Sequence, residues 1–332
     1  MNIIIDAMGP EQGPEVIIEG IKLIGSNITG DVHFILVGDS SFINKYSDEL
    51  DSIDISYEIV HTVNNITMDD LPSNALRNKD ESSIAKGLEI TSMRDDSAFI
   101  SMGNTGAVMA FSLKKLGRIK GIKRPAIGTV FPMGNHPLML DMGATSDSSP
   151  EMIYQFALMG AEYAHASMDK EDPLIGLLSI GEEETKGSKI IQSAYEMISN
   201  DETLNFYGNI EGDDIFKDKV DVIVTDGFTG NIIIKFAEGM ASYIKDSIKS
   251  IYNKSFSAKI GLGLAKPAMT GFFRQLSYDE YGGAPLLGVN GITIIGHGKS
   301  NAKAVSSAIM NALHLIENDF TGHLKHRIET RS

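Results

Sequence analysis

The feature that most constrains the fold of this 332-residue chain is a repeated alternation of short apolar runs with longer amphipathic stretches. Apolar runs of strand length occur at residues 3–6, 32–37, 53–60, 98–101, 126–131, 138–141, 174–180, 220–225 and 292–295. Apolar residues recur at the three- and four-residue spacing of helices at residues 14–24, 82–93, 150–165, 188–199, 231–251 and 301–317. This alternation predicts a three-layer α/β/α protein in which helices cover both faces of a mostly parallel sheet.

Glycine-rich sequences follow five of the predicted strands. They read DAMGPEQGP (6–14), SMGNTG (101–106), SIGEEETKG (179–187), TDGFTGN (225–231) and IIGHGKSNA (294–302). Ligands of parallel sheets bind at the carboxyl ends of the strands, where glycine lets backbone N–H groups approach an anion and the following helix adds its unpaired amides. We expect these loops to surround one anion. The alternative is that each glycine only makes a tight turn between strand and helix.

Several chemistries are excluded by the residues that the chain lacks. It contains no cysteine, which removes disulfides, thiolate metal ligands and a cysteine nucleophile. There is no Gly-x-Ser-x-Gly elbow, and a Walker A motif at Gly296–Ser300 would need glycine where Thr293 stands. A Gly-x-Gly-x-x-Gly fingerprint is also missing, and Asp226 with Glu183 could hold Mg²⁺ only if the fold joined them. We therefore expect no metal and no cofactor.

Charge is distributed unevenly along this acidic chain. Its formal net charge is −15, which argues against nucleic-acid binding because that requires a basic face. One segment, KKLGRIKGIKRP, is an exception, with six cations at Lys114, Lys115, Arg118, Lys120, Lys123 and Arg124. Such a patch can steer an acidic partner. A solvated helix end, where lysines complement the helix dipole, explains the same residues without a partner.

The size and polarity of the chain predict its setting. A hydrophobic content of 42% supports a large core, in a single domain of residues 1–332 with or without two lobes around a cleft. The start MNIIIDAMG has no signal-peptide pattern, and no window is apolar enough to span a bilayer, so we expect a cytoplasmic protein.

One apolar segment does not look like an ordinary surface. Residues 256–273 follow a predicted long helix and are rich in exposed-type apolar residues. We expect a protruding helical hairpin at 250–275 whose tip residues Ile260, Leu262 and Leu264 enter a membrane interface. Packing in a dimer or around an acyl chain is the alternative.

Nine motifs, read in order, resemble the bacterial phosphate acyltransferases. They are DAMGPEQGP, SMGNTGAVMA, GRIKGIKRPAIG, LDMGATSD, GLLSIGEEETKG, NFYGNIEGDDI, VTDGFTGNIIIK, YGGAPLLGVNG and HGKSNAKAV. The resemblance implies a fold like that of isocitrate and isopropylmalate dehydrogenases, a homodimer, and transfer of a fatty acyl group from acyl-acyl-carrier-protein to inorganic phosphate. It also implies that the acyl phosphate feeds a membrane-bound glycerol-3-phosphate acyltransferase. With the apolar segment at 256–273, we expect peripheral association with the inner face of the cell membrane. The chain departs from the family at Pro10 and Glu11, where glycine and aspartate are usual, and proline cannot donate a backbone hydrogen bond.

The resemblance and the loops together suggest the site residues. Without a cysteine or a serine elbow, direct attack of phosphate on the thioester is the simplest route. We expect Lys186 to stabilise charge and His297 to move a proton or bind the oxyanion, with Asn104 and Asp226 also catalytic. The expected phosphate and substrate contacts are Asp6, Gly103, Thr105, Gly106, Gly227, Thr229, Gly230 and Asn231. The six cations between Lys114 and Arg124 then become the expected docking patch for the acidic carrier protein.

Three other functions remain open from the sequence. A phosphate acetyl- or butyryltransferase would share the attacking phosphate but use coenzyme A. A lipid- or phosphate-binding scaffold would bind the same ligands without turnover. A decarboxylating dehydrogenase of related fold would need a nicotinamide cofactor and a divalent metal.

Overall fold

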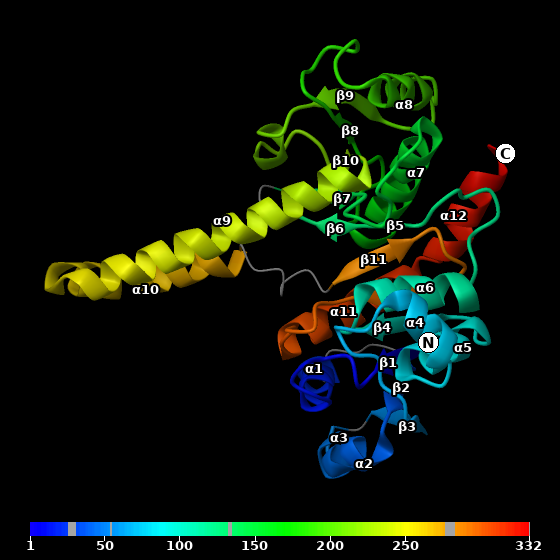
Figure 1. Cartoon of the computed structure of the whole chain (residues 1–332), viewed down its shortest axis with the longest axis vertical. Helices are drawn as coiled ribbons and strands as arrows, with labels where there is room; N and C mark the ends of the chain where they lie inside the picture. The colour runs from blue at the N-terminus through cyan, green and yellow to red at the C-terminus, as the bar shows by residue number, and fades with distance from the viewer. Residues whose placement is uncertain (26–30, 54, 132–134, 276–282, 332) are drawn as a thin grey trace.

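Two β-sheets, one above the other in Figure 1, organise the chain. The computed structural model describes residues 1–25, 31–53, 55–131, 135–275 and 283–331. The larger sheet has the strand order β3 (Ser56–His61), β2 (His33–Gly38), β1 (Asn2–Asp6), β4 (Ser97–Ser101), β12 (Ile292–Ile295), β11 (Ala284–Leu287) and β5 (Ala126–Ile127). All neighbours pair in parallel except at β11, which is antiparallel to both β12 and β5.

The smaller sheet repeats this arrangement with five strands. Their order is β6 (Thr129–Val130), β7 (Leu138–Leu140), β10 (Val222–Val224), β8 (Ile175–Leu178) and β9 (Phe206–Ile210). Only β6 is antiparallel to its neighbour. Two mostly parallel sheets with helices around them confirm the predicted α/β class.

The chain passes between the two sheets at residues 126–131. The sequence predicts one strand there, but the structure divides it, so that β5 belongs to the larger sheet and β6 to the smaller. Gly128 lies between the two short strands, and its N–H donates to the carbonyl of Pro285 in β11 (3.0 Å). All of residues 126–131 are at least half-buried, and this one apolar run supplies a short strand to each of the two sheets.

Helices cover both faces of the larger sheet. Alternate residues of β1 divide between two apolar clusters, with Ile3 and Ile5 in one and Ile4 in the other. The first cluster includes α1 (Glu15–Gly25) and α11 (Ala302–Glu317), which pack on each other, and the second includes α5 (Ser83–Ser92) and α6 (Thr105–Lys115). Helix α7 (Pro150–Ser167) packs against α8 (Lys189–Ser199), α11 and α12 (Phe320–Glu329). Shorter helices are α2 (Ser40–Ile43), α3 (Ser47–Asp51) and α4 (Pro72–Asn78), with 3₁₀ turns at Asn44–Tyr46 and Asp214–Phe216.

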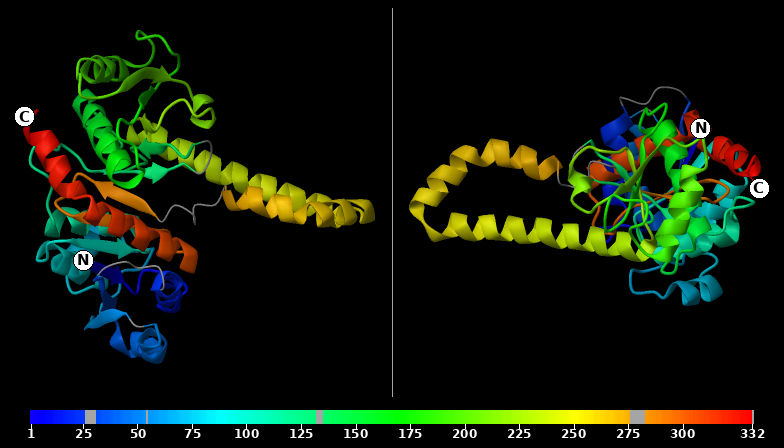
Figure 2. Two further views of the ribbon diagram at one scale, coloured as in Figure 1. Left: turned by 180° about the vertical axis from the view of Figure 1, so that it is seen from behind. Right: turned by 90° about the horizontal axis from the view of Figure 1, so that it is seen from above.

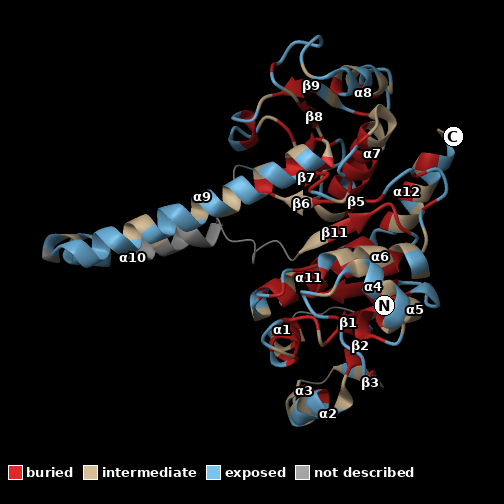
Figure 3. Cartoon of the chain, in the orientation of Figure 1, coloured by how far each residue is buried: buried red, intermediate tan, exposed pale blue. Residues whose placement is uncertain are grey.

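A helical arm projects from this body. It consists of α9 (Gly227–Lys254) and α10 (Phe256–Gln275), which pack on each other and extend away from both sheets (Figures 1 and 2). Figure 3 shows that most of α9 is exposed, in contrast to the buried strands. None of the helices in the described part of the chain is both long enough and apolar enough to cross a bilayer.

Candidate active site

Three of the five glycine-rich loops meet at the carboxyl edge of the larger sheet. They follow β1, β4 and β12, which are adjacent and parallel. The N–H of Gly296 donates to the carbonyl of Ser101, and the N–H of Glu11 to that of Gly298, both at 2.8 Å. A Cβ on Gly9 would lie 2.8 Å from the Gly103 nitrogen, so this contact requires glycine. We call residues 6–13, 101–106 and 296–300 the large-sheet loop cluster.

Asp6 supports this cluster from below. Its side chain is buried and accepts hydrogen bonds from the Ser101 hydroxyl (2.7 Å) and the Met8 N–H (3.1 Å). Burial raises the pKa of the carboxyl above its ordinary value, although these hydrogen bonds oppose the shift. A buried carboxyl that is used by its own loops is suited to holding them in place and unsuited to attracting phosphate.

Asn104 joins a fourth loop to the cluster. Its Oδ1 caps α6 by accepting from the Ala107 N–H (3.0 Å). Its Nδ2 donates to the carbonyls of Thr67, Met68 and Asp70 at 3.1, 3.2 and 2.9 Å, in the loop that follows β3. Both ends of the amide are therefore engaged within the protein, and Asn104 positions two elements where the sequence predicted a catalytic group.

Polar groups that remain accessible lie around the rim of the cluster. Thr105 is exposed at the first turn of α6, and His297 and Lys299 are exposed before α11. The Nδ1 of His297 lies 3.1 Å from the Lys299 N–H, which donates to it. A neutral His297 therefore carries its proton on Nε2, where the N–H can donate a hydrogen bond outward.

The loops of the smaller sheet form a second cluster, which Asp141 organises. This buried side chain follows β7 and accepts hydrogen bonds from four backbone N–H groups, at Ile127 (3.1 Å), Gly143 (3.2 Å), Ala144 (3.0 Å) and Thr145 (2.8 Å). Burial raises the pKa of Asp141, with the four hydrogen bonds opposing that effect. Since Ile127 lies in β5, Asp141 also ties the smaller sheet to the crossing strand.

The first turn of α9 packs tightly on the Asp141 loop. A Cβ on Gly230 would overlap the backbone oxygen of Asp141, and one on Gly227 would overlap that of Thr145. Asp226 caps the helix by accepting from the N–H (2.9 Å) and the hydroxyl (2.6 Å) of Thr229. Gly227 and Gly230 thus allow α9 to pack closely on the Asp141 loop, and the Asp226 carboxylate caps its first turn.

Lys186 stands on the loop after β8, the neighbour of β10. Its side chain is about half-exposed, at 48%, and its Nζ lies 3.9 Å from Glu183 Oε2. The loop is fixed by Asn209, whose Nδ2 donates to the Glu183 carbonyl (2.9 Å). The ammonium group is therefore available to an external anion.

The predicted site residues fall into two groups, one at each sheet. The large-sheet loop cluster contains Asp6, Gly103, Asn104, Thr105, Gly106 and His297. The loops of the smaller sheet contain Lys186, Asp226, Gly227, Thr229, Gly230 and Asn231. The sequence predicts that all five loops surround one anion; among the described residues, the hydrogen bonds and close contacts given above join loops of the same sheet.

The basic segment is partly neutralised by the protein itself. Lys114 and Lys115 lie 2.8 and 3.3 Å from Asp80, and Lys123 lies 3.4 Å from Glu151. Arg118 donates to the backbone carbonyls of Ile122 and Lys123. Within the described part of the chain, the exposed Lys120 and Arg124 make no ion pair.

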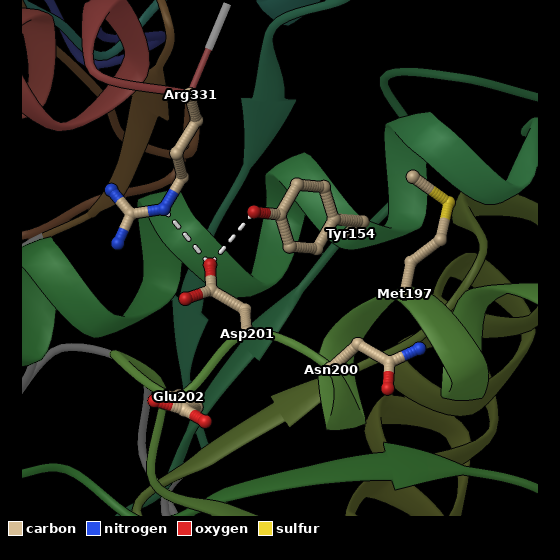
Figure 4. Close-up of a pocket in the computed structure, with 6 residues that line it drawn as sticks. All are labelled: Tyr154, Met197, Asn200, Asp201, Glu202 and Arg331. Carbon is tan, nitrogen blue, oxygen red and sulfur yellow. Dashed lines mark hydrogen bonds and ion pairs between the residues drawn. The ribbon is translucent and has the colours of Figure 1, made fainter.

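A shallow cavity of about 570 Å³ lies away from both clusters, near the end of α12 (Figure 4). Its centre is Asp201, which accepts from the Tyr154 hydroxyl (2.7 Å) and from Arg331 Nε (2.9 Å). Because these side chains are hydrogen-bonded to one another, we interpret them as a network that fastens the C-terminal helix. Among the described residues, no group of three or more His, Asp or Glu side chains is arranged to hold a metal ion.

Sequence reasoning missed two parts of the site. Asp141 carried no signal beyond its place at the end of a predicted strand. The loop after β3 has no periodic pattern, and its connection to Asn104 depends on side-chain hydrogen bonds between residues more than thirty positions apart.

Comparisons with known proteins agree with this architecture. The family model described as "Fatty acid synthesis protein" matches residues 1–323. The phosphate acyltransferase of Halothermothrix orenii is 42% identical over 330 residues, covering 99% of this chain and 98% of that protein. The solved phosphotransacetylase of Streptococcus pyogenes has a TM-score of 0.61 at 17% identity, covering 96% of this chain and 94% of that one. A Salmonella typhimurium structure, described as a 4-hydroxythreonine-4-phosphate dehydrogenase, has a TM-score of 0.51 at 12% identity, with 95% and 99% covered. At these identities the two structures are evidence for the fold alone.

Proposed function

Because the chain belongs to the phosphate acyltransferase family, we propose that this acyltransferase transfers a fatty acyl group from a thioester to inorganic phosphate at the large-sheet loop cluster. The observation that carries the location is the convergence of three strand-end loops beneath the exposed His297. The first turn of α6 adds backbone amides and the Thr105 hydroxyl at the same edge. Such groups bind phosphate without needing a metal.

The reaction requires the protein to position phosphate against the thioester, and it proceeds without a covalent acyl-enzyme. An oxygen of hydrogen phosphate attacks the carbonyl carbon, the C–S bond breaks, and the proton of the phosphate passes to the departing sulfur. The products are acyl phosphate and a free thiol. That transfer needs no relay through His297, whose Nδ1 lone pair accepts from the Lys299 N–H and whose Nε2 already carries a proton; His297 is suited instead to donate a hydrogen bond from Nε2 to the carbonyl oxygen. Groups at a pre-formed edge stabilise the charge that develops on the carbonyl oxygen.

The second group of predicted residues supports binding of the donor. Lys186 is half-exposed and only loosely paired with Glu183, so it can bind an anionic part of the substrate. Thr229 Oγ1 is bonded to Asp226, and Asn231 is exposed beside it on α9. We propose that Lys186 and Asn231 contact the donor from the smaller sheet, while Asp226 and Thr229 hold the helix.

We propose acyl-acyl-carrier-protein as the donor. The support from this chain is the basic segment, where Lys120 and Arg124 remain available to an acidic carrier. Lys114, Lys115, Arg118 and Lys123 already have partners, so they contribute to docking less than their charges suggest. Lys120→Glu should raise KM for the carrier-borne donor and weaken its salt dependence.

The arm supports a homodimer. Phe228, Ile232, Phe236, Met240 and Tyr243 recur at three- and four-residue spacing along α9 and are between 43% and 69% exposed. A stripe of this kind on a soluble helix calls for a partner surface, and a second copy supplies an identical one.

We further propose that the end of the arm contacts the membrane surface, so that acyl phosphate reaches a membrane glycerol-3-phosphate acyltransferase. Ile260 and Leu264 are exposed there and Leu262 is partly buried, with Lys259 beside them. Vesicle flotation tests this, because Ile260→Glu with Leu264→Glu should abolish flotation on anionic vesicles.

The function is tested by incubating the pure protein with palmitoyl-carrier protein and labelled phosphate. Formation of acyl phosphate supports the proposal, and a protein that binds both substrates without turnover would be a scaffold. Acetyl- and butyryl-coenzyme A in parallel decide the alternative of a CoA-dependent phosphate acetyl- or butyryltransferase.

A further inference from the structure

The loop that follows β3 presents an unusual surface. Residues 62–71 cross the carboxyl edge of the larger sheet and carry three large apolar side chains that face solvent. Val63 is 78% exposed, Leu71 is 63% exposed and Met68 is 43% exposed. We call these three residues the apolar lip. Large apolar side chains that share one loop and face water mark a candidate binding surface.

The lip is held in place by an internal network. Ile66 anchors the loop in the core with 3% exposure. The N–H and hydroxyl of Thr67 donate to Asp70 Oδ2 at 2.7 and 3.1 Å, and Lys79 Nζ lies 2.7 Å from the same oxygen. Together with the three bonds from Asn104, these contacts fix the backbone that carries the lip.

The lip adjoins the loops that carry the proposed chemistry. Met68 Cε would lie 3.2 Å from a Cβ placed on Gly298, next to His297. Pro72, directly after Leu71, would lie 2.6 Å from a Cβ placed on Gly106, next to Thr105. Apolar side chains of this segment thus adjoin two of the three loops of the large-sheet loop cluster.

We propose that the apolar lip binds the alkyl chain of the acyl donor and sets the preference for long chains; this inference rests on the proposed function. When the thioester carbonyl lies at the polar edge beside His297, the attached alkyl chain must lie along the neighbouring protein surface. The lip is the adjoining apolar surface, and burial of the chain would remove apolar area from water on both sides. Met68 suits this task because its unbranched side chain adapts to different chain positions.

The test compares chain lengths on one donor. The ratio of kcat/KM for palmitoyl- over butyryl-carrier protein is measured for the wild type, for Met68→Gln and for Val63→Asn with Leu71→Gln. We expect the ratio to fall by about tenfold or more in the lip variants, because methylene burial accounts for the preference. Leu23→Gln, a change of an exposed leucine on α1, is the matched control and should leave the ratio unchanged.

Two results would overturn the inference. If kcat/KM is unchanged for both donors in both lip variants, the alkyl chain lies elsewhere. If kcat/KM falls by the same factor for both donors, which leaves the ratio unchanged, the lip contacts the carrier. Equilibrium binding of palmitoyl-carrier protein and of the free carrier distinguishes failure of the inference about the lip from failure of the proposed function. If no acyl phosphate forms in the wild type, the function fails, while lip-dependent binding of the palmitoyl donor alone still supports the inference and lip-independent binding rejects it.

Discussion

At the scale of single residues, substitution of His297 tests the proposed chemistry most directly. It lies on the surface of its loop, and its Nδ1 accepts from the Lys299 N–H. His297→Ala should lower kcat by roughly 10²–10³-fold, the range typical of one lost hydrogen-bond donor to the oxyanion. Its melting temperature should stay close to that of the wild type, because the side chain packs against little.

His297→Gln provides the matched control, since its side-chain amide retains a hydrogen-bond donor. Partial recovery of kcat in His297→Gln relative to His297→Ala would assign His297 to binding of the oxyanion. Full activity of the alanine variant would remove the residue from the mechanism.

Asn104 shows how one amide can determine both stability and site geometry. Asn104→Ala removes the cap of α6 and leaves three carbonyls without their donor, so we expect a loss of about 2 kcal/mol or more in the free energy of unfolding. Asn104→Ser keeps a capping oxygen and loses only the donor. Urea titration of both variants separates the contributions, and a serine variant as stable as the wild type would show that the bonds to residues 67–70 add nothing.

At the scale of elements, the start of α9 depends on close backbone contact. Gly230→Ala would place its Cβ on the backbone oxygen of Asp141, which must then shift, and we expect a loss of more than about 2 kcal/mol in unfolding free energy. Gly261→Ala in α10 is the control, because no atom lies within 4 Å of the added carbon. There we expect a gain of up to about 1 kcal/mol from the higher helix propensity of alanine. Equal destabilisation in thermal unfolding would contradict the role given to Gly230.

The C-terminal helix is fastened by a charge network that responds to pH. Burial favours the neutral Asp201 carboxyl, but hydrogen bonds from Thr203, Tyr154 and Arg331 outweigh it and hold the pKa below its ordinary value. Burial, together with its bond to Asp201, raises the pKa of Tyr154 to about 12. A carboxyl with a lowered pKa stabilises the fold at pH values above its unfolded pKa, and this contribution is lost as the pH falls through the folded pKa.

We therefore expect Asp201→Asn to lose about 1–3 kcal/mol of unfolding free energy at pH 7. The difference from the wild type should persist down to about pH 4 and shrink below it. Denaturant titrations across that range measure it. A difference that stays constant below pH 4 would show that the carboxylate charge is not what fastens the helix.

The elements themselves were largely predictable, and the exceptions have physical reasons. Helices such as α7 and α11 carry long apolar faces, so periodicity located them. Strands β9 and β11 were missed because glycine, proline and polar residues interrupt their apolar pattern. The division of residues 126–131 between two sheets was also hidden, since burial in either sheet requires the same apolar residues.

At the scale of the whole molecule, the glycine-rich loops do follow the strands as the sequence predicts, but the sequence could not show how the two sheets divide them. Strand order decides which loops meet, and order depends on contacts between residues far apart in the sequence. The same limit explains why Asp6 was expected to bind substrate. Its burial beneath Ser101 follows from β1 pairing with β4, which no local pattern encodes.

The exposed apolar stripe on α9 predicts the oligomeric state of the protein. Phe236 and Tyr243 lie on the same stripe of α9 and are 66% and 69% exposed. Phe236→Glu with Tyr243→Glu would place four carboxylates in the shared interface of a homodimer, two from each copy, and like charges without partners oppose association. We expect sedimentation velocity to show the wild type as a dimer and this variant as a monomer. Lys245→Glu with Lys249→Glu, which changes charge on the arm but not the stripe, should remain dimeric. A wild type that sediments as a monomer at micromolar concentration would leave the stripe to another partner, and the end of the arm would then have to act on the membrane as a single hairpin.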